Sequence, residues 1–335
     1  MNKKYYISLV CAFLFCAVFS SVFYIFSSDK KEGKVYTKTV YSFENVQGPI
    51  QPIPRNLIID KNWLVLGKAL FHSPLLSKDN TISCASCHMI DFGGDDGFPV
   101  STGINNGQGE RNSPTVLNAT FNFRQFWDGR ASSLAEQAIG PIHNPVEMGS
   151  TWNEIIVKLS EDDYFTETFN RLSEDGVTAE NIIKAITIYE ESLITPNSPI
   201  DDYLLGDKNA LTEQQIRGLS LFNNYGCSTC HQGVNIGGNI YQKLGRINDI
   251  PQILTLDKGR FEVTNERIDE YIFKVPTLRN IAETAPYFHN GSIDNLPDAV
   301  RIMAKSQLGR ELSKEEVADI VALLHSFSAK VLEVK

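Results

Sequence analysis

The chain has 335 residues, 42% of them hydrophobic, which is enough apolar material for one large or two medium-sized cores. It carries 31 Lys and Arg residues against 40 Asp and Glu residues, a formal net charge of −9. This acidic balance argues against a nucleic-acid partner, because little basic surface is available for phosphate groups.

The first predicted element is an apolar segment at the N-terminus. Lys3 and Lys4 precede an uncharged run over residues 5–26, which would span about 33 Å as a helix, enough to cross a bilayer. The run ends in bulky side chains and lacks the small residues of a cleavage site. We therefore expect residues 1–28 to be a retained inner-membrane anchor, with a cleaved signal peptide as the alternative. Lysines before the run predict a periplasmic body.

A polar stretch follows. Residues 29–56 contain several charged side chains, with three prolines near the end. This composition predicts an extended tether between the membrane and the folded body.

Two copies of one short motif account for every cysteine after residue 28. A single C-x-x-C pair would also suit a thioredoxin-like disulfide, and two pairs would suit a zinc site, but neither requires His directly after the second thiol. Cys-x-x-Cys-His attaches a c-type haem: the thiols add to the vinyl groups and the His reaches the iron. The sequence therefore predicts two covalently bound haems. The motifs are Cys84-x-x-Cys87-His88 and Cys227-x-x-Cys230-His231.

The chain repeats itself around these motifs. A G-x-x-L-F block precedes each motif, and a Pro-Thr pair after each motif is followed, twelve residues after the proline, by F-x-x-G. Matching spacing of this kind indicates two homologous haem domains, which we place at residues 57–205 and 206–335. The repeated blocks are residues 67–71 and 114–129 in the first half and residues 218–222 and 276–291 in the second.

Helical spacing of apolar residues dominates the body, and no sustained alternating stretch indicates a sheet core. Several of these segments begin with Thr or Ser followed three residues later by a side chain that can complete a cap. The sequence thus predicts a mostly α fold. The segments are residues 55–72, 151–172, 178–193, 212–226 and 312–327.

The second ligand of each iron separates electron transfer from catalysis. Met303, on a predicted helix after the second motif, is a candidate ligand, although a methionine can equally fill a gap in a core. After the first motif, Met89 is too close to His88 to reach the opposite face, and residues 90–111 contain neither His nor Met. The first iron is therefore expected to be open, with a ligand from elsewhere in the chain as the alternative.

On these residues the chain resembles the bacterial dihaem cytochrome c peroxidases, a family that also contains the dihaem MauG enzymes. The resemblance covers about residues 54–330, with both motifs and the blocks around them in order. It implies reduction of hydrogen peroxide with two electrons and two protons to two waters. Electrons would arrive at the haem of His231 and Met303 and be used at the haem of His88.

The resemblance also implies roles for individual side chains. Glu147 would be the acid–base group that moves a proton between the two peroxide oxygens, with Gln137 beside it. Trp127 would lie between the haems and assist electron passage. His289 would lie near a propionate of the second haem. A calcium ion would be held by Asn112 and by the backbone carbonyls of Thr284 and Pro286.

One position departs from the family pattern. Many members carry a histidine eight residues before the Asn of the R-N-S-P segment, and it caps the peroxidatic iron in the oxidised enzyme. In this chain that position is Ile104, which cannot ligate. We expect a first haem that stays open in every redox state and needs no reductive activation.

Two alternative functions remain. A dihaem electron-transfer cytochrome would need both irons capped, which the loop after His88 does not favour. A MauG-like oxidase that modifies a protein would, by the resemblance, carry a tyrosine in place of Met303. For a peroxidase, the electron donor would be a small cytochrome c, a cupredoxin or a quinol-linked partner, and the enzyme could be a homodimer.

Overall fold

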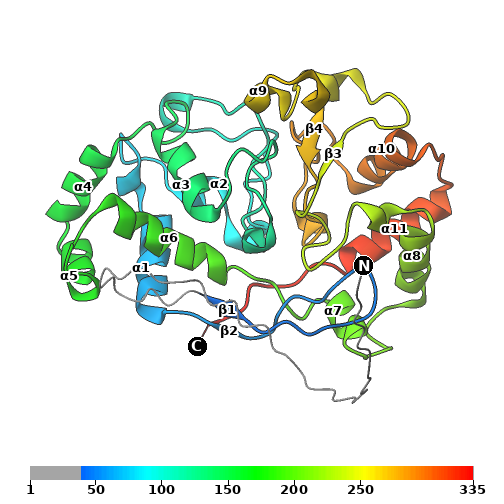
Figure 1. Ribbon diagram of the computed structural model, residues 1–335, viewed down its shortest axis with the longest axis horizontal. Coiled ribbons are helices and arrows are strands. Elements are labelled where there is room, and N and C mark those ends of the chain that lie inside the picture. The colour runs from blue at the N-terminus through cyan, green and yellow to red at the C-terminus, as the bar shows by residue number, and fades with distance from the viewer. Residues whose placement is uncertain (1–38, 335) are drawn as a thin grey trace, which may run out of the picture. The chain divides into compact units, whose positions relative to one another are not determined.

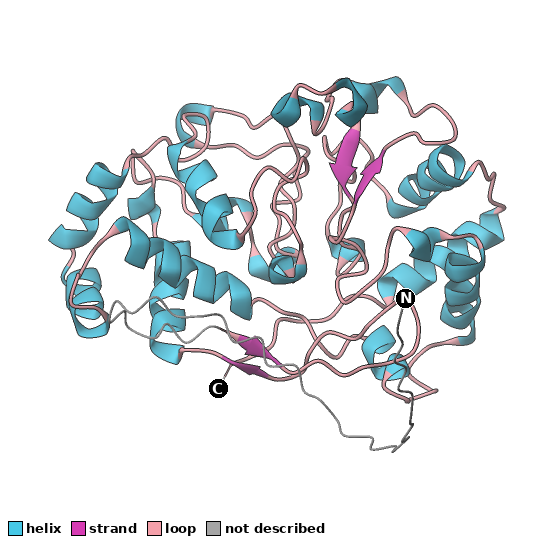
Figure 2. Ribbon diagram, viewed as in Figure 1, coloured by secondary structure: helices cyan, strands magenta, loops and turns pink. Residues whose placement is uncertain are grey.

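The computed structural model describes residues 39–334, which belong to one compact unit and are mostly helical (Figure 1; Figure 2). The prediction of a mostly α fold is therefore confirmed. Two small antiparallel sheets complete the regular structure of these residues: β1 (Val40–Tyr41) pairs with β2 (Leu57–Ile58), and β3 (Tyr241–Lys243) pairs with β4 (Ile272–Lys274). The α-helices are α1 (Lys61–His72), α2 (Cys84–Cys87), α3 (Leu134–His143), α4 (Trp152–Glu161), α5 (Asp163–Leu172), α6 (Ala179–Ser192), α7 (Pro199–Leu204), α8 (Glu213–Asn224), α9 (Phe261–Thr264), α10 (Leu296–Leu308) and α11 (Lys314–His325).

The predicted helix starts are confirmed by their hydrogen bonds. The side chains of Thr151, Thr178, Thr212 and Ser313 each accept a hydrogen bond from the backbone N–H three residues later. These bonds satisfy donors that the first helical turn leaves unpaired. The sequence therefore locates the starts of α4, α6, α8 and α11 by purely local chemistry.

The internal repeat appears in the structure as two similar helix pairs. Helix α1 packs on α6, and α8 packs on α11. A Cβ atom at Gly67 would lie 1.9 Å from the carbonyl oxygen of Ala185, and a Cβ at Gly218 would lie 2.1 Å from that of Asp319. Only glycine permits so close an approach of two helices. The glycine of each G-x-x-L-F block is thus the contact point of a helix pair.

Each helix pair contributes to its own hydrophobic core. The larger cluster joins α1, α3, α4, α5 and α6 and includes Leu66, Ile142, Phe169 and Ile182. A separate cluster joins α8, α10 and α11 and includes Phe222, Leu323 and Phe327. Two separate cores are consistent with two haem domains. The domain boundary between residues 205 and 206 stays a prediction.

The structure corrects the predicted tether. Residues 39–56, its described part, pack on the folded body: Ile50 and Ile53 are buried, and the Tyr41 hydroxyl donates to the Glu191 carbonyl oxygen over 2.7 Å. In the sequence, Ile50 and Ile53 stand among polar residues and prolines, so the average composition of the segment does not reveal two side chains that favour burial.

A membrane anchor over residues 5–26 was expected from the sequence. That segment lies outside the described residues. Within residues 39–334, no helix is both long and apolar enough to cross a membrane.

Candidate haem sites

The first motif forms a short helix that directs its histidine inward. Cys84 and Cys87 begin and end α2, and the backbone N–H of His88 donates to the Cys84 carbonyl oxygen over 3.0 Å. The His88 Nδ1 atom lies 3.2 Å from the Gly94 carbonyl oxygen and 3.3 Å from the Ser113 hydroxyl. Burial lowers the pKa of His88. A neutral imidazole anchored through Nδ1 can offer its Nε2 atom to iron.

The second motif has the same backbone closure. The N–H of His231 donates to the Cys227 carbonyl oxygen over 3.0 Å, after the short 3₁₀ helix η5 (Cys227–Thr229). Burial lowers the pKa of His231 to about 4, so that this imidazole is also neutral. Both motifs therefore place two thiols and one neutral imidazole together, which is the donor set that a c-type haem requires.

The cavity beside the second motif, here called the second cavity, measures about 250 Å³. It is lined mainly by apolar side chains, as a haem plane requires, and both thiols of the motif open into it. Met303 enters the same cavity from α10, together with His231. The Met303 side chain packs against a cluster that includes Leu244 and Phe273. The structure thus brings the candidate methionine ligand and the motif histidine to one cavity.

The cavity beside the first motif, here called the first cavity, is larger, about 700 Å³. Its lining contains the first motif with His88, and also Gln137, Glu147 and Trp127, which are the three side chains for which catalytic roles were expected. Gln137 lies on α3, and Glu147 lies in the loop that follows this helix. The first motif and the three candidate catalytic side chains thus share one cavity.

The environment of Glu147 raises the pKa of its carboxyl group. Burial is the main cause, while a hydrogen bond from Asn144 Nδ2 to Oε1 over 2.6 Å and the charge of Arg130 act in the opposite direction. A carboxyl group with a raised pKa can both accept and donate a proton near neutral pH, as an acid–base catalyst must.

Ile104 has a structural role that the sequence did not reveal. Its backbone N–H donates to the Glu147 carbonyl oxygen over 2.8 Å. Its buried side chain packs against the turn at Gly149 rather than lining the first cavity. The residue at the expected capping position therefore supports the loop that presents Glu147.

Trp127 lies between the two cavities and contributes to the lining of both. Its Nε1 atom donates to the Asn112 carbonyl oxygen over 2.9 Å, and its own carbonyl oxygen accepts from the Lys274 backbone N–H over 2.8 Å. Residue 127 thus makes one hydrogen bond with each half of the chain, through its indole with the first half and through its backbone with the second.

His289 occupies the repeat-related position in the second half. The residues before Trp127 and His289, Phe126 and Phe288, share an unusual positive φ of 67° and 69°. His289 lines the second cavity, and its buried Nε2 atom has no hydrogen-bond partner among the described residues. Its ring stacks on Phe273 with 4.4 Å between centroids. An unpaired ring nitrogen on a residue that lines the cavity suits a hydrogen bond with a haem carboxylate.

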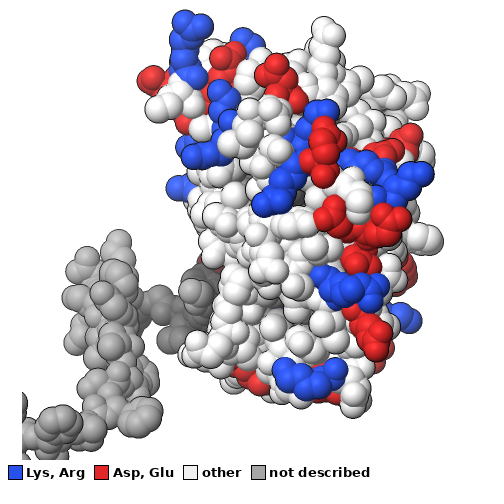
Figure 3. All heavy atoms as spheres, turned by 90° about the vertical axis from the view of Figure 1, so that its right-hand side faces the viewer, with Lys and Arg blue, Asp and Glu red and all other residues white. Residues whose placement is uncertain are grey.

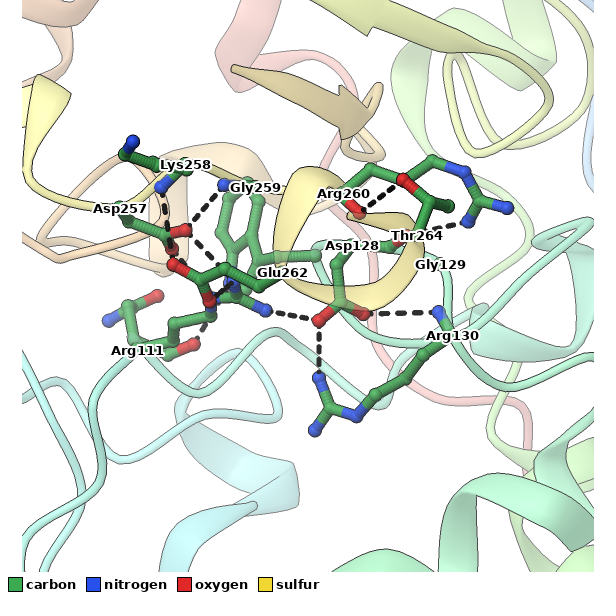
Figure 4. A network of polar contacts seen from close by, with 12 residues as sticks. Arg111, Asp128, Gly129, Arg130, Asp257, Lys258, Gly259, Arg260, Glu262 and Thr264 are labelled. Carbon is green, nitrogen blue, oxygen red and sulfur yellow. Dashed lines mark hydrogen bonds and ion pairs between the residues drawn. The ribbon is translucent and has the colours of Figure 1, made fainter. Parts of the chain in front are cut away.

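A network of ion pairs closes the contact between the halves next to Trp127 (Figure 4). Arg111, from the first half, pairs with Asp128 and donates two hydrogen bonds to Asp257, at 2.6 and 2.8 Å. It also bonds Glu262 at 2.9 Å. Arg260 donates to the Asp128 carbonyl oxygen over 3.1 Å. Sequence reasoning missed this network, because its members lie far apart in the chain.

The three residues expected to hold calcium line the same cavity. Asn112, Thr284 and Pro286 all line the second cavity. Asn112 Nδ2 donates to the Phe98 carbonyl oxygen over 2.9 Å. Within residues 39–334 no group of three or more His, Cys, Asp or Glu side chains forms a metal site. A site built mainly from carbonyl oxygens and water would not form such a group, and calcium stays a prediction.

Fold and sites together define a class: a c-type cytochrome with two haem sites of unequal character. Comparisons with known proteins give the family. Residues 61–209 match the family model described as di-haem cytochrome c peroxidase. The chain is 46% identical over 302 residues to the cytochrome c peroxidase Ccp of Escherichia coli (strain K12), a match that covers 89% of this chain and 65% of that protein.

A second relative, the cytochrome c551 peroxidase of Pseudomonas aeruginosa, is 45% identical over 291 residues, which cover 84% of each chain. A solved structure of a MauG-like protein associated with microbial copper homeostasis has a TM-score of 0.73 at 26% identity, covering 85% of this chain and 93% of that one. The chain therefore belongs to the di-haem cytochrome c peroxidase family, as the resemblance implied, and it is an enzyme of that class.

Proposed function

We propose that the chain reduces hydrogen peroxide to water at the first cavity, with electrons that a redox donor delivers at the second. One observation carries the proposal: Glu147 and Gln137 share the larger cavity with His88, whereas Met303 shares the other cavity with His231. When bound, the two haems supply iron centres that exchange single electrons. The chain supplies the iron ligands, the groups that transfer protons and the separation between the two haem sites.

At the first cavity, the work of the protein is proton transfer. His88 would hold the iron of the bound haem. The carboxylate of Glu147 accepts a proton from one peroxide oxygen and returns it to the other, which becomes the leaving water. The Gln137 amide can orient peroxide by hydrogen bonding. Two protons and two electrons are consumed for each peroxide, and two waters are formed.

At the second cavity, the task is electron transfer. Ligation by Met303 opposite His231 would raise the reduction potential of this haem, so that it accepts electrons readily from a donor. Trp127, which lines both cavities, would assist passage of each electron to the first haem.

Calcium has a proposed place beside this path. Asn112 and the carbonyls of Thr284 and Pro286 offer hard oxygen donors of the kind that calcium binds, with waters completing its shell. Asn112 also accepts the Trp127 indole N–H through its backbone carbonyl. A bound ion would therefore help to hold Trp127 in place.

The donor would be a small cytochrome, a cupredoxin or a quinol-linked partner that meets the enzyme in the periplasm, where residues 5–26 would anchor it to the inner membrane. Figure 3 shows one face of the second half with basic and acidic side chains interspersed. Such a face does not select for a strongly charged donor. We also propose that the enzyme forms a homodimer, as the family resemblance implies.

The experiment is peroxide-dependent oxidation of reduced cytochrome c by the holoprotein. A peroxidase oxidises the donor in proportion to the peroxide added. An electron-transfer cytochrome would exchange electrons with the donor without any dependence on peroxide. A MauG-like oxidase would consume peroxide only with its own protein substrate. Either of the last two results would contradict the proposed function.

A further inference from the structure

Glu190 is a buried carboxyl group that the mechanism above does not use. It lies on α6, only 5% of its surface is exposed, and it lines the first cavity. Its Oε2 atom has no hydrogen-bond partner among the described residues. Buried carboxylates are normally paired or hydrogen-bonded, because an isolated charge in an apolar environment is unfavourable. This group therefore needs an explanation.

The internal repeat provides a comparison within the same chain. Gly67 faces Tyr189 on α6 in the same way as Gly218 faces Leu323 on α11: a Cβ atom added to either glycine would lie 2.9 Å from the Cβ of its partner. One residue further along each helix, Glu190 corresponds to Leu324. Leu324 is buried and lines the second cavity. A leucine is thus sufficient to pack this position against a haem, and the carboxyl group is specific to the first cavity.

We propose that Glu190 is a redox-linked proton site of the first haem, an inference that rests on the proposed function because it requires a haem at His88. When the iron gains one electron from the donor, the Glu190 carboxylate binds one proton and becomes a carboxylic acid. When the iron loses that electron, the proton is released. The positive charge of the oxidised centre stabilises the carboxylate, and the poorly screened interior makes this coupling strong.

The surroundings of Glu190 agree with this behaviour. Burial, and then the charge of Glu191, raises the pKa of Glu190 to about 8. The Cys84 thiol also interacts electrostatically with Glu190, and it stops titrating once it becomes a thioether. The helices that pack on α6 carry further titratable side chains, Lys61, Lys68 and His72 on α1 and Glu136 and His143 on α3. The first cavity is also lined by the charged side chains Glu110, Arg111, Asp128, Arg130, Glu147 and Glu262.

The test is the reduction potential of each haem, measured spectroelectrochemically on the holoprotein at pH values from about 6 to 9. In the wild type, the reduction potential of the first haem should fall as pH rises. For one proton taken up per electron, the slope should approach ~59 mV per pH unit, because one pH unit is a tenfold change in proton concentration. In Glu190→Gln, which preserves size, the slope should be lost. The variant should match the wild type at low pH and show a higher potential at high pH.

Glu190→Leu is a second variant, because it installs the side chain that the repeat already uses. It should flatten the slope in the same way, and the second haem is the internal reference in every sample. A merely structural role for Glu190 would not change a pH slope. If Glu190→Gln and Glu190→Leu bind two haems and retain the wild-type slope, the inference is wrong.

Haem content and peroxide turnover of the wild type separate this inference from the proposed function. Two attached haems and normal turnover, with a slope that does not depend on Glu190, would contradict the inference alone. Failure of the wild type to reduce peroxide with both haems attached would contradict the proposed function alone. Failure to attach a haem at His88 would contradict both.

Discussion

Glu147 has a raised pKa because the protein shields its carboxyl group from water, while Asn144 and Arg130 partly restore the charged form. The balance of these effects matters more than the residue type. Asp79, an exposed carboxylate hydrogen-bonded to Thr81, has a lowered pKa and could not serve as an acid near neutral pH. The chemistry of a carboxyl group is thus set by its site.

Glu147→Gln should bind peroxide and cleave it slowly, with a loss in kcat of about 10²–10⁴-fold for one acid–base group. In the wild type, activity should fall as pH decreases through the raised pKa of Glu147, because the protonated group cannot accept the first proton. That acid limb should be absent in the variant. Steady-state kinetics against pH measure both effects, and near-normal turnover in the variant would remove Glu147 from the mechanism.

Ile104→His should shift the first haem toward low spin and create a requirement for reductive activation. The new side chain could reach the iron only if its loop leaves Gly149 and gives up the hydrogen bond to Glu147. Electron paramagnetic resonance of the oxidised proteins is the measurement, with Ile104→Val as the control that keeps an apolar side chain. Two purely low-spin haems in the oxidised wild type would contradict the open-site hypothesis.

At the scale of elements, α10 carries Met303 to the second cavity, which His231 also lines. Asn295 caps the start of the helix, its side chain accepting from the Asp298 N–H, and Gly309 caps the end with a φ of +66°. Both ends are set by local chemistry. With the helix fixed at its two ends, Met303 has a defined position along it.

Met303→Ala should open the second iron, and Met303→His should lower its reduction potential while both haems stay attached. Either change should slow turnover with a high-potential donor. Ile302→Ala is the matched control, because Ile302 packs in the same cluster on the same helix. Redox potentiometry and absorption spectra are the measurements. If the Met303 variants keep the wild-type potential and spectrum, Met303 is a core residue and the assigned ligand is wrong.

At the scale of the whole molecule, electron passage depends on how the two halves meet. Trp127 takes one hydrogen-bond partner from each half, and Arg111 joins Asp128, next to this tryptophan, to Asp257 in the second half. The contact is therefore polar and specific, and it has to form correctly for the two cavities to share one indole.

Arg111→Gln should slow electron transfer from the second haem to the first and lower the free energy of unfolding. Loss of one partner from a fully buried ion pair costs about 3–5 kcal/mol. The effect here should be smaller, because Arg130 still pairs with Asp128. Stopped-flow reduction of the first haem and denaturant unfolding are the two measurements.

Arg217→Gln is the control for this prediction. Arg217 pairs with Asp319 through two hydrogen bonds, yet its side chain is 58% exposed. Exposed pairs of this kind contribute about 0–1 kcal/mol. Equal effects of the Arg111 and Arg217 substitutions on electron transfer would show that the contact between the halves is not specific.

The sequence by itself determined the features whose causes lie within a few residues. The two haem motifs are local covalent chemistry, the caps of α4, α6, α8 and α11 are hydrogen bonds over three residues, and the repeat is a matter of spacing. The family followed from these features, and the comparisons confirmed it. The positions of Glu147 and Met303 relative to the two motifs were implied only by resemblance.

Tertiary structure decided what depends on contacts between distant segments. The composition of residues 39–56 indicates a polar tether, but packing of Ile50 and Ile53 docks them on the body. Arg111 meets Asp257 across 146 positions of the chain, and nothing in the sequence around either residue indicates the other. Burial of Glu190 likewise follows from the way α6 faces the first cavity. Such contacts depend on the free energy of packing whole elements together, which local patterns do not contain.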